Sequence, residues 1–408
     1  MKRLLLIALF PLLMGASSGD FVKLSGHVKA FGLGTVPYAS RLMPPGAVGS
    51  AVIDARLKLK VKPWTWLTFS FDPTMTATLG GAATGRTGVG LSGPELVSMT
   101  AYFVDGPTFQ LRFRMDRALM AVEMGPVRLT VGRQPITFGQ GQMFTPMDLV
   151  APFNPSVLDT SHKPGVDAVR ADVFIGMSGK ISVLGVYLGE QSLGETGVPT
   201  GEDPEPVDIE DVGVAVHGGG TVVTVDLHGF LGMLYGDFVG GASVYAPIGP
   251  IGLYGDVTVT VANKYAYPRA VVGVLVRPTP TTTVSAEIYA QRFGTTTRTN
   301  YLAMQSTERF LRGELWQAGH LYGGLVIAQE ITPLVSASAV VVANLLDPSA
   351  FISGNVAWSV ASNADLSAGV QIGVGKKPDE ELENPLFSTR SEFGLIPVTG
   401  FVQLGVYF

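Results

Sequence analysis

In the segment from Ala51 to Lys62, apolar and charged residues alternate without a break from Ile53 onward. Side chains of an extended strand point to opposite faces in turn, so one face of this segment is apolar and the other is charged. The charged positions are Asp54, Arg56, Lys58, Lys60 and Lys62. Residues 22–30 show the same pattern, with Lys23 and Lys29 on the polar face. Strands of this kind have to lie between an apolar medium and an aqueous one.

The composition favours many short strands over helices. The 408 residues include 51 glycines and 27 prolines, and no long stretch repeats apolar residues at helical spacing. Beyond the N-terminus, no uninterrupted apolar run approaches the ~20 residues that a membrane helix needs. The absence of cysteine excludes a disulfide framework, a thiolate metal site and a cysteine nucleophile.

The N-terminus has the pattern of a secretory signal peptide. Lys2 and Arg3 precede an apolar run from Leu4 to Met14, and small residues follow up to Ser18. A buried N-terminal helix is the alternative, which the charge-free run ending in Gly-Ala-Ser-Ser disfavours. We expect residues 1–18 to be a cleaved signal peptide and residues 19–408 to form one domain, because no linker or fixed repeat divides them.

Eighteen segments have about the length that a tilted transmembrane strand requires. An even number is what a bacterial outer-membrane barrel needs, and sixteen is the alternative count. The segments lie near residues 21–32, 51–62, 64–73, 108–124, 127–138, 165–176, 180–190, 209–217, 220–233, 237–246, 250–261, 268–277, 282–293, 311–328, 334–345, 350–360, 364–374 and 392–408. We predict an all-β fold, a single transmembrane antiparallel up-and-down β-barrel of about 18 strands.

The end of the chain indicates where this barrel resides. Alternation alone does not distinguish a lipid-facing strand from a strand of a soluble sandwich. Residues 402–408 place apolar side chains at every second position before the terminal Phe408. This ending resembles the signal by which the barrel-assembly machinery recognises outer-membrane barrels. Together with export, it predicts a protein of the bacterial cell outer membrane that contacts lipid and lipopolysaccharide, and no nucleic acid.

Short and long connectors alternate along the predicted strands. Short turns, expected on the periplasmic side, lie at Gly125-Pro126, Ser178-Gly179, Gly218-Gly219, 247–250 and 278–280. Longer loops, expected outside, cover residues 74–107, 139–164, 191–208, 294–309 and 375–391. Acidic residues are concentrated at positions 190–211 and 379–383. They predict either a solvated loop surface or a divalent-cation site that bridges lipopolysaccharide. Trp64, Trp66 and Tyr407 would form part of an aromatic girdle near the periplasmic interface.

Basic residues concentrate in the first 170 residues. A Lys or Arg on the lipid face near mid-bilayer costs about 2–4 kcal/mol, so most of these side chains should point into the lumen. The predicted pore-lining residues are Lys23, Lys29, Arg56, Lys58, Lys60, Arg112, Arg114, Arg128, Arg133 and Arg170. A basic lumen concentrates anions. The alternative is that these residues pair with acids such as Asp54, Asp116 and Asp172 and fill the barrel with salt bridges.

Residues 127–170 combine a strand with Gly132-Arg133-Gln134, a Phe-Gly-Gln-Gly turn and a proline-rich loop that contains Asp. Within residues 108–175, this stretch resembles the alginate-export type of outer-membrane porin. The resemblance implies an 18-stranded barrel with an arginine-rich conduit for an anionic polysaccharide. Arg133, with Arg128 and Arg170, matches that conduit by position.

In two of these strands, the alternation of apolar and polar residues shifts from odd to even positions or places a charge on the apolar face. Arg133 shares a face with Val127, Leu129 and Val131, so a β-bulge at Gly132 is expected to return it to the lumen. In residues 108–124 the apolar positions are odd up to 115 and even from 118. This shift predicts a bulge near Asp116, unless the first part is a loop.

The loop from Gly139 to Pro164 contains four prolines. Such a rigid segment can fold inward and constrict a lumen, and the alternative is an external flap. The predicted constriction residues are Asp148, Asn154, Asp159 and His162.

The sequence shows no sign of catalysis. Its five histidines lack metal-ligand spacing, and no catalytic constellation can be assembled from it. We therefore predict no enzyme, no metal site and no cofactor. Three classes of function stay open: a channel for small or polymeric hydrophilic solutes, for which the basic lumen predicts anions, a structural or adhesive barrel with a closed lumen, and a barrel enzyme.

Overall fold

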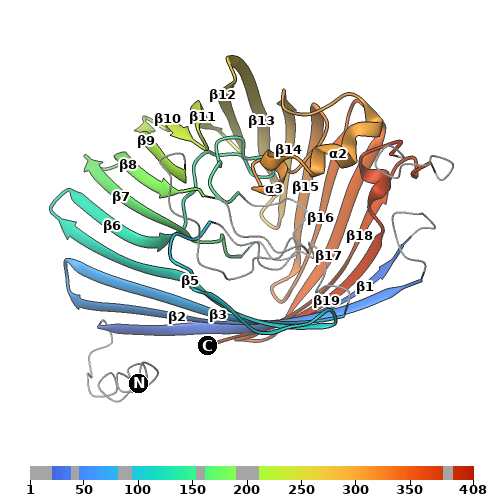
Figure 1. Ribbon diagram of the computed structural model, residues 1–408, viewed down its shortest axis with the longest axis horizontal. Coiled ribbons are helices and arrows are strands. Elements are labelled where there is room, and N and C mark those ends of the chain that lie inside the picture. The colour runs from blue at the N-terminus through green and yellow to red at the C-terminus, as the bar shows by residue number, and fades with distance from the viewer. Residues whose placement is uncertain (1–20, 38–45, 81–93, 153–160, 190–210, 380–388) are drawn as a thin grey trace.

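Pairing between the first and last strands closes the fold into a barrel (Figure 1). The computed structural model describes residues 21–37, 46–80, 94–152, 161–189, 211–379 and 389–408. In these segments the strands form a single antiparallel sheet. They are β1 (Val22–Val36), β2 (Val48–Trp64), β3 (Leu67–Gly80), β4 (Thr100–Asp105), β5 (Phe109–Met124), β6 (Val127–Gln134), β7 (Val166–Ile175), β8 (Gly179–Tyr187), β9 (Val212–Val222), β10 (Val225–Leu234), β11 (Asp237–Ile248), β12 (Ile251–Ala262), β13 (Tyr265–Thr279), β14 (Thr282–Gln291), β15 (Leu321–Thr332), β16 (Val335–Asn344), β17 (Ser349–Ala361), β18 (Ala364–Val374) and β19 (Val398–Tyr407).

The closed barrel has 18 strand positions, which confirms the predicted fold class. Strands β4 and β6 share one of these positions, because both pair with the same edge of β5. β4 pairs with residues 110–114 of β5, and β6 pairs with residues 118–124. β4 was not predicted, since it is short and lies within the segment expected to be an external loop. Each of the eighteen predicted strands overlaps an observed one, although β15 begins at Leu321 rather than near residue 311.

Connector lengths separate the two ends of the barrel. At one end, every described turn is two or three residues long, and these turns lie at 65–66, 125–126, 176–178, 223–224, 249–250, 280–281, 333–334 and 362–363. We call this the short-turn end. The prediction of a turn at Gly218-Gly219 is wrong, because both residues lie within β9 and the chain turns at Val223, whose φ is 61°. The opposite end carries the long connections and the tight turns at 235–236 and 263–264.

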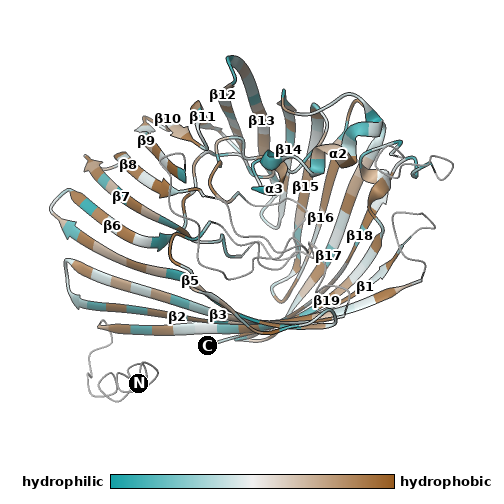
Figure 2. Cartoon of the chain, in the orientation of Figure 1, coloured by the Kyte–Doolittle hydropathy of each residue, from teal (hydrophilic) through white to brown (hydrophobic). Residues whose placement is uncertain are grey.

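Apolar side chains cover the outer face of the wall. Val272 of β13 is 69% exposed, whereas its neighbour Val271 is 1% exposed and points inward. The same alternation appears as brown bands separated by paler or teal ones along the strands (Figure 2). At the short-turn end, Trp64 and Trp66 stack with ring centroids 5.5 Å apart, and both are exposed. An apolar outer face with aromatic residues at its rim is typical of a transmembrane barrel.

The structure resolves both predicted phase changes. Near Asp116 the pairing of β3 with β5 shifts by one residue, as expected for a bulge. At Gly132 the prediction is wrong, because β6 pairs with β5 and β7 through this residue without a shift. Gly132 instead adopts a φ of 110°, a conformation that favours glycine.

Short helices occur only in the connections among the described segments. The connection from β14 to β15 contains η3 (Arg298–Asn300), α2 (Tyr301–Gln305) and α3 (Glu308–Leu311), and η5 (Phe393–Leu395) precedes β19. None of the helices in the described part of the chain has the length and apolar character to cross a membrane. The expected signal peptide, residues 1–18, lies outside the described residues.

If the outer face contacts lipid, a charge placed at its centre should destabilise the barrel. The substitution Val272→Arg, at the middle of β13, is expected to lower the free energy of unfolding by about 2–4 kcal/mol. Urea titration of the barrel folded in phospholipid vesicles measures this change. Ser367→Arg, on the inner face of β18 beside Asp365, is the matched control and should cost less than about 1 kcal/mol. Equal losses in both variants would contradict a lipid-facing outer surface.

Candidate functional site in the barrel lumen

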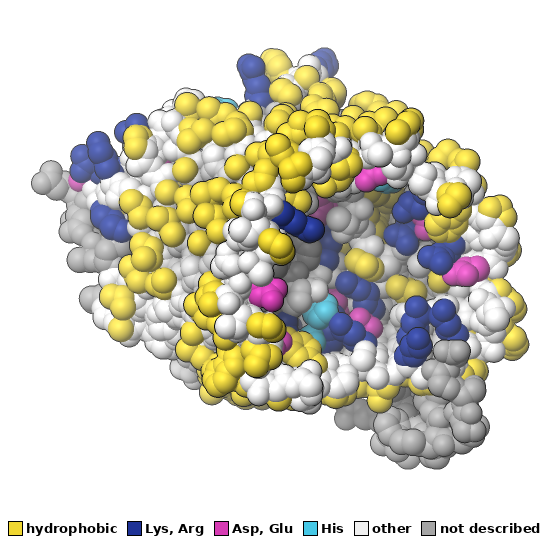
Figure 3. Space-filling view, turned by 180° about the vertical axis from the view of Figure 1, so that it is seen from behind, with side chains coloured by type: hydrophobic (Ala, Val, Ile, Leu, Met, Phe, Trp, Pro, Cys, Tyr) yellow, Lys and Arg dark blue, Asp and Glu magenta, His cyan; other side chains and the backbone are white. Residues whose placement is uncertain are grey.

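The basic residues of β1 and β2 lie on the inner face of the wall. Lys23 is paired across the strands with Lys60, His27 with Arg56, and Lys29 with Asp54. On the opposite face the same strands expose apolar side chains such as Ile53. The space-filling view shows a hollow in which Lys and Arg side chains lie beside Asp, Glu and His (Figure 3).

Most of the arginines predicted to line the lumen are engaged with acids. Arg56 Nη1 lies 2.6 Å from an Asp116 carboxylate oxygen, and Arg114 Nε lies 3.2 Å from Glu95. Arg170 and Arg128 pair with Asp172 and Glu123 at 3.1 and 2.6 Å. Arg112 lies opposite Tyr102 of β4. Removing one partner of a buried ion pair strongly destabilises a protein, so the buried Arg56 and Arg114 mainly hold the wall together.

Arg133 is the most deeply buried of this set, with an exposed fraction of 0%. Its guanidinium donates to both carboxylate oxygens of Asp167 at 2.9 Å, and to the carbonyls of Val97 and Met115. Glu95 lies 3.1 Å from it. Arg133 therefore ties the segment before β4 to β5 and β7 at the point where β6 leaves the wall, and no part of it is open to solvent.

Three lysines of the predicted set differ from the arginines. Lys23, Lys58 and Lys60 form no ion pair with the residues that the structure describes, and all three retain exposed surface. They lie on the inner face of β1 and β2, where Lys23 is opposite Lys60 and Lys58 is opposite Ser25. We call them the lysine row. The two interpretations of the basic wall thus apply to different residues: most of the arginines pair with acids, whereas the lysine row forms no ion pair with the described residues.

The described parts of the segment between β6 and β7, residues 135–152 and 161–165, lie inside the barrel (Figure 1). Two carboxylates on the inner wall hold its backbone. Asp256 of β12 accepts hydrogen bonds from the amides of Gln140 and Gly141. Glu287 of β14 accepts from the amides of residues 142, 143 and 144 at 2.8–3.1 Å. Charged acceptors satisfy amides that would otherwise be buried without partners.

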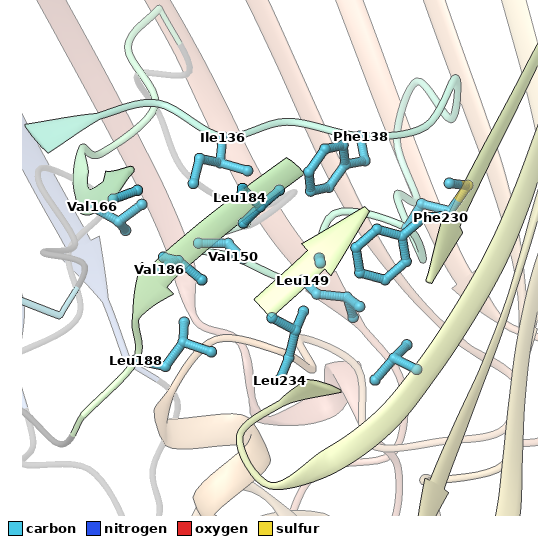
Figure 4. Close-up of a cluster of buried hydrophobic side chains, with 14 residues drawn as sticks. Ile136, Phe138, Leu149, Val150, Val166, Leu184, Val186, Leu188, Phe230 and Leu234 are labelled. Atoms are coloured by element: carbon cyan, nitrogen blue, oxygen red, sulfur yellow. The ribbon is translucent and has the colours of Figure 1, made fainter. Parts of the chain in front are cut away.

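Apolar side chains of the same segment pack on the wall. Phe138 lies 5.2 Å from Phe230 of β10, measured between ring centroids, in a cluster with Ile136 and Leu184 (Figure 4). Phe144 stacks on Tyr289 of β14 at 4.8 Å. Burial of these rings fixes the first half of the segment against β8–β15.

The end of this segment returns to the basic wall. Lys29 Nζ donates to Ser161 Oγ at 2.5 Å, and the His162 ring stacks on His27 with centroids 5.1 Å apart. Lys163 pairs with Asp148, and both are buried. The described residues of this segment thus touch opposite sides of the lumen, and we call residues 135–152 and 161–165 the crossing loop. Of the predicted constriction residues, Asp148 is structural, His162 lies at the wall, and Asn154 and Asp159 fall outside the described residues.

A second inward connection was not anticipated from the sequence. Glu314, after α3, lies 3.3 Å from Arg269 on the inner face of β13 and also pairs with Arg309 and Arg312. Glu392 accepts from the Ala318 amide and from Tyr322 and Asn344. For Asp256 and Glu287, which hold the crossing loop, the available signal was a single acid in a strand with no other charged residue, because a buried acid requires a partner.

Removing the carboxylate of Glu287 should release the crossing loop. In Glu287→Ala the amides of residues 142–144 lose an acceptor worth about 1.5–3 kcal/mol per charged hydrogen bond. Their hydrogen exchange is expected to accelerate at least tenfold, as measured by mass spectrometry. Glu330→Ala, at an exposed position of β15, should leave these amides unchanged. Unaltered protection in Glu287→Ala would show that the carboxylate does not hold the loop.

Acid should loosen the other end of the crossing loop. Burial, followed by the charges of Arg56 and Lys58, lowers the pKa of His162 from 6.5 to about 4. A depressed pKa stabilises the docked loop fully above pH 6.5, and this contribution is lost as the pH falls towards 4. Hydrogen exchange of the amides near residue 162 should therefore rise over this range beyond the intrinsic rate. His162→Gln should abolish that extra dependence, and its persistence would assign it to another group.

Known proteins resemble this chain only at the level of structure. No family model matches the sequence, and no curated protein matches it. The chain is similar to a BenF-like porin from Pseudomonas fluorescens Pf-5, with a TM-score of 0.57, 9% identity and coverage of 96% of this chain and 99% of that chain. It is also similar to Acinetobacter baumannii OccAB4 (TM-score 0.56, 9% identity, 95% and 98% covered) and OccAB3 (TM-score 0.54, 9% identity, 96% and 100% covered). These similarities show a porin-type barrel fold, and they do not show the alginate-export type.

Proposed function

We propose that this chain is a channel of the bacterial outer membrane that passes small hydrophilic solutes and prefers anions. The observation that carries the proposal is the lysine row, three positive side chains on the inner wall of β1 and β2 that form no ion pair with the described residues. Positive charge on the wall of a lumen raises the local concentration of anions and lowers their barrier to entry. The fold that the chain shares with porins supports transport as the role of this lumen.

The crossing loop favours small solutes over a polymer. It is held by Asp256 and Glu287 on one side and reaches His27 and Lys29 on the other. A conduit divided in this way suits single small molecules that pass beside the loop. The anionic polysaccharide implied by the resemblance to the alginate-export type is the less favoured solute for this reason.

A closed structural barrel is the second candidate. Its support is the same crossing loop, together with the inward connection that places Glu314 on Arg269. In this case the lumen would be filled by salt bridges and loop packing, and the protein would carry no current.

Conductance in planar bilayers tests both candidates. The purified barrel is expected to give discrete open-channel steps, with a reversal potential in a KCl gradient that indicates preference for chloride over potassium. The variant Lys23→Gln/Lys58→Gln/Lys60→Gln should reduce the chloride to potassium permeability ratio several-fold, because it removes the three unpaired charges. Lys264→Gln, in the tight turn after β12, is the matched control and should leave the ratio unchanged.

Two outcomes would overturn the proposal. A correctly folded barrel that stays electrically silent would favour the closed structural candidate. An open channel whose selectivity does not respond to loss of the lysine row would show that this row does not line the conduit.

A further inference from the structure

Two neighbouring rows of inner-face residues cross β7, β8, β9 and β10 near the short-turn end. In one row the cross-strand pairing places Phe174, Lys180, Gly219 and His228 side by side. In the next row it places Asp172, Ser182, His217 and Phe230 side by side. The strand register therefore brings together a lysine and two histidines that are far apart in the sequence.

A cavity of about 300 Å³ lies at this junction, lined by side chains that include Phe174, Lys180, His217 and His228. Gly219 makes room for it. A Cβ atom at this position would lie 2.1 Å from His228 Nδ1, so any other residue would displace the imidazole. The absence of a side chain at Gly219 therefore lets the His228 ring lie directly over its backbone, in the wall of the cavity that Lys180 also lines.

The charges around this cavity are not balanced. Lys180 forms no ion pair within the described segments. Asp172, in the neighbouring row, is already engaged, since it accepts from Ser182 Oγ at 2.6 Å and from Arg170 Nε at 3.1 Å. A cation beside satisfied acids leaves a net positive cavity.

The two imidazoles add hydrogen-bonding capacity. Their rings stack with centroids 5.4 Å apart and planes inclined by 17°. In the segments that the structure describes, neither ring makes a hydrogen bond to a protein group. An imidazole N–H and a lysine ammonium are both donors, and donors that converge on one space suit an anionic acceptor.

We propose that this cavity binds a small oxyanion, a carboxylate or phosphate group, through Lys180, His217 and His228. Phe174, 42% exposed, and Met177 give the cavity an apolar rim that could accept the body of an organic anion. The site lies on the β7–β10 wall, away from the lysine row of β1 and β2. It deepens the proposed function and rests on it for the passage of solutes, but binding itself does not require an open conduit.

The test is a histidine-detected titration of the full barrel folded in detergent. Protein labelled with ¹⁵N-histidine is titrated with sodium phosphate, and separately with sodium acetate, at pH 7 and constant ionic strength balanced with chloride. The resonances of His217 and His228, assigned with His217→Gln and His228→Gln, are expected to shift and saturate. Lys180→Met should weaken the apparent affinity at least fivefold. Lys60→Met, which removes another unpaired lumen lysine, should leave it within twofold of the parent.

The remaining outcomes of the titration decide whether the oxyanion site exists. Shifts that grow linearly without saturation for both anions, or an unchanged affinity in Lys180→Met, would overturn it. If Lys180→Met does not fold, two other variants replace it. Lys180→Arg retains the charge and should keep the affinity of the parent, whereas His228→Gln should reduce it. Equal affinity in the parent, Lys180→Arg and His228→Gln would also overturn the proposal. Saturation by phosphate alone or by acetate alone identifies which oxyanion the site takes.

The same samples separate this proposal from the channel function. A barrel that is electrically silent but gives saturable shifts would end the channel proposal and leave the oxyanion site standing. A barrel that conducts anions but gives no saturable shift would do the reverse.

Discussion

The structure depends on the hydrogen-bonding needs of its backbone. In an apolar medium every unpaired backbone N–H or C=O group costs several kcal/mol, and a sheet escapes this cost only when it closes. Pairing of β1 with β19 achieves the closure. β4 serves the same need, because β6 has 8 residues against 16 in β5 and cannot pair with its whole edge. Arg133 then ties the segment before β4 to the wall through the Val97 carbonyl.

Closure also produces an interior lined by polar and charged groups, and these groups need partners. Most of the arginines form ion pairs with acids, as Arg56 does with Asp116. Asp256 and Glu287 have the crossing loop as their partner, because its backbone amides donate hydrogen bonds to their carboxylates. Within the described segments, the lysine row and Lys180 form no ion pair. Function is proposed for these lysines, and for the two histidines beside Lys180, because ion pairing does not account for them.

The sequence predicted the wall well because strand alternation is local. The apolar and charged faces of residues 51–62 could be assigned without any knowledge of neighbouring strands. The change in the alternation of apolar residues near Asp116 predicted a bulge, which the strand pairing confirms. The same reasoning failed at Gly132, where a change in φ at a single glycine replaced the expected bulge. It also failed at Gly218-Gly219, since a pair of glycines can sit in a strand where a partner side chain, here His228 over Gly219, needs the space.

The sequence by itself determined the barrel, the apolar outer face, the approximate strand count and the basic character of the first strands. The apolar outer face and the basic character of the first strands follow from side chains at every second position along one strand, and the barrel follows when the number of such segments and the pattern of residues 402–408 are added. The tertiary structure alone decided which charges are neutralised and which are free, where the crossing loop is anchored, and that Lys180, His217 and His228 share one cavity. The reason is physical: a strand's own sequence fixes which face a residue points to, but only the register of four strands and the path of an inward loop fix what that residue meets there.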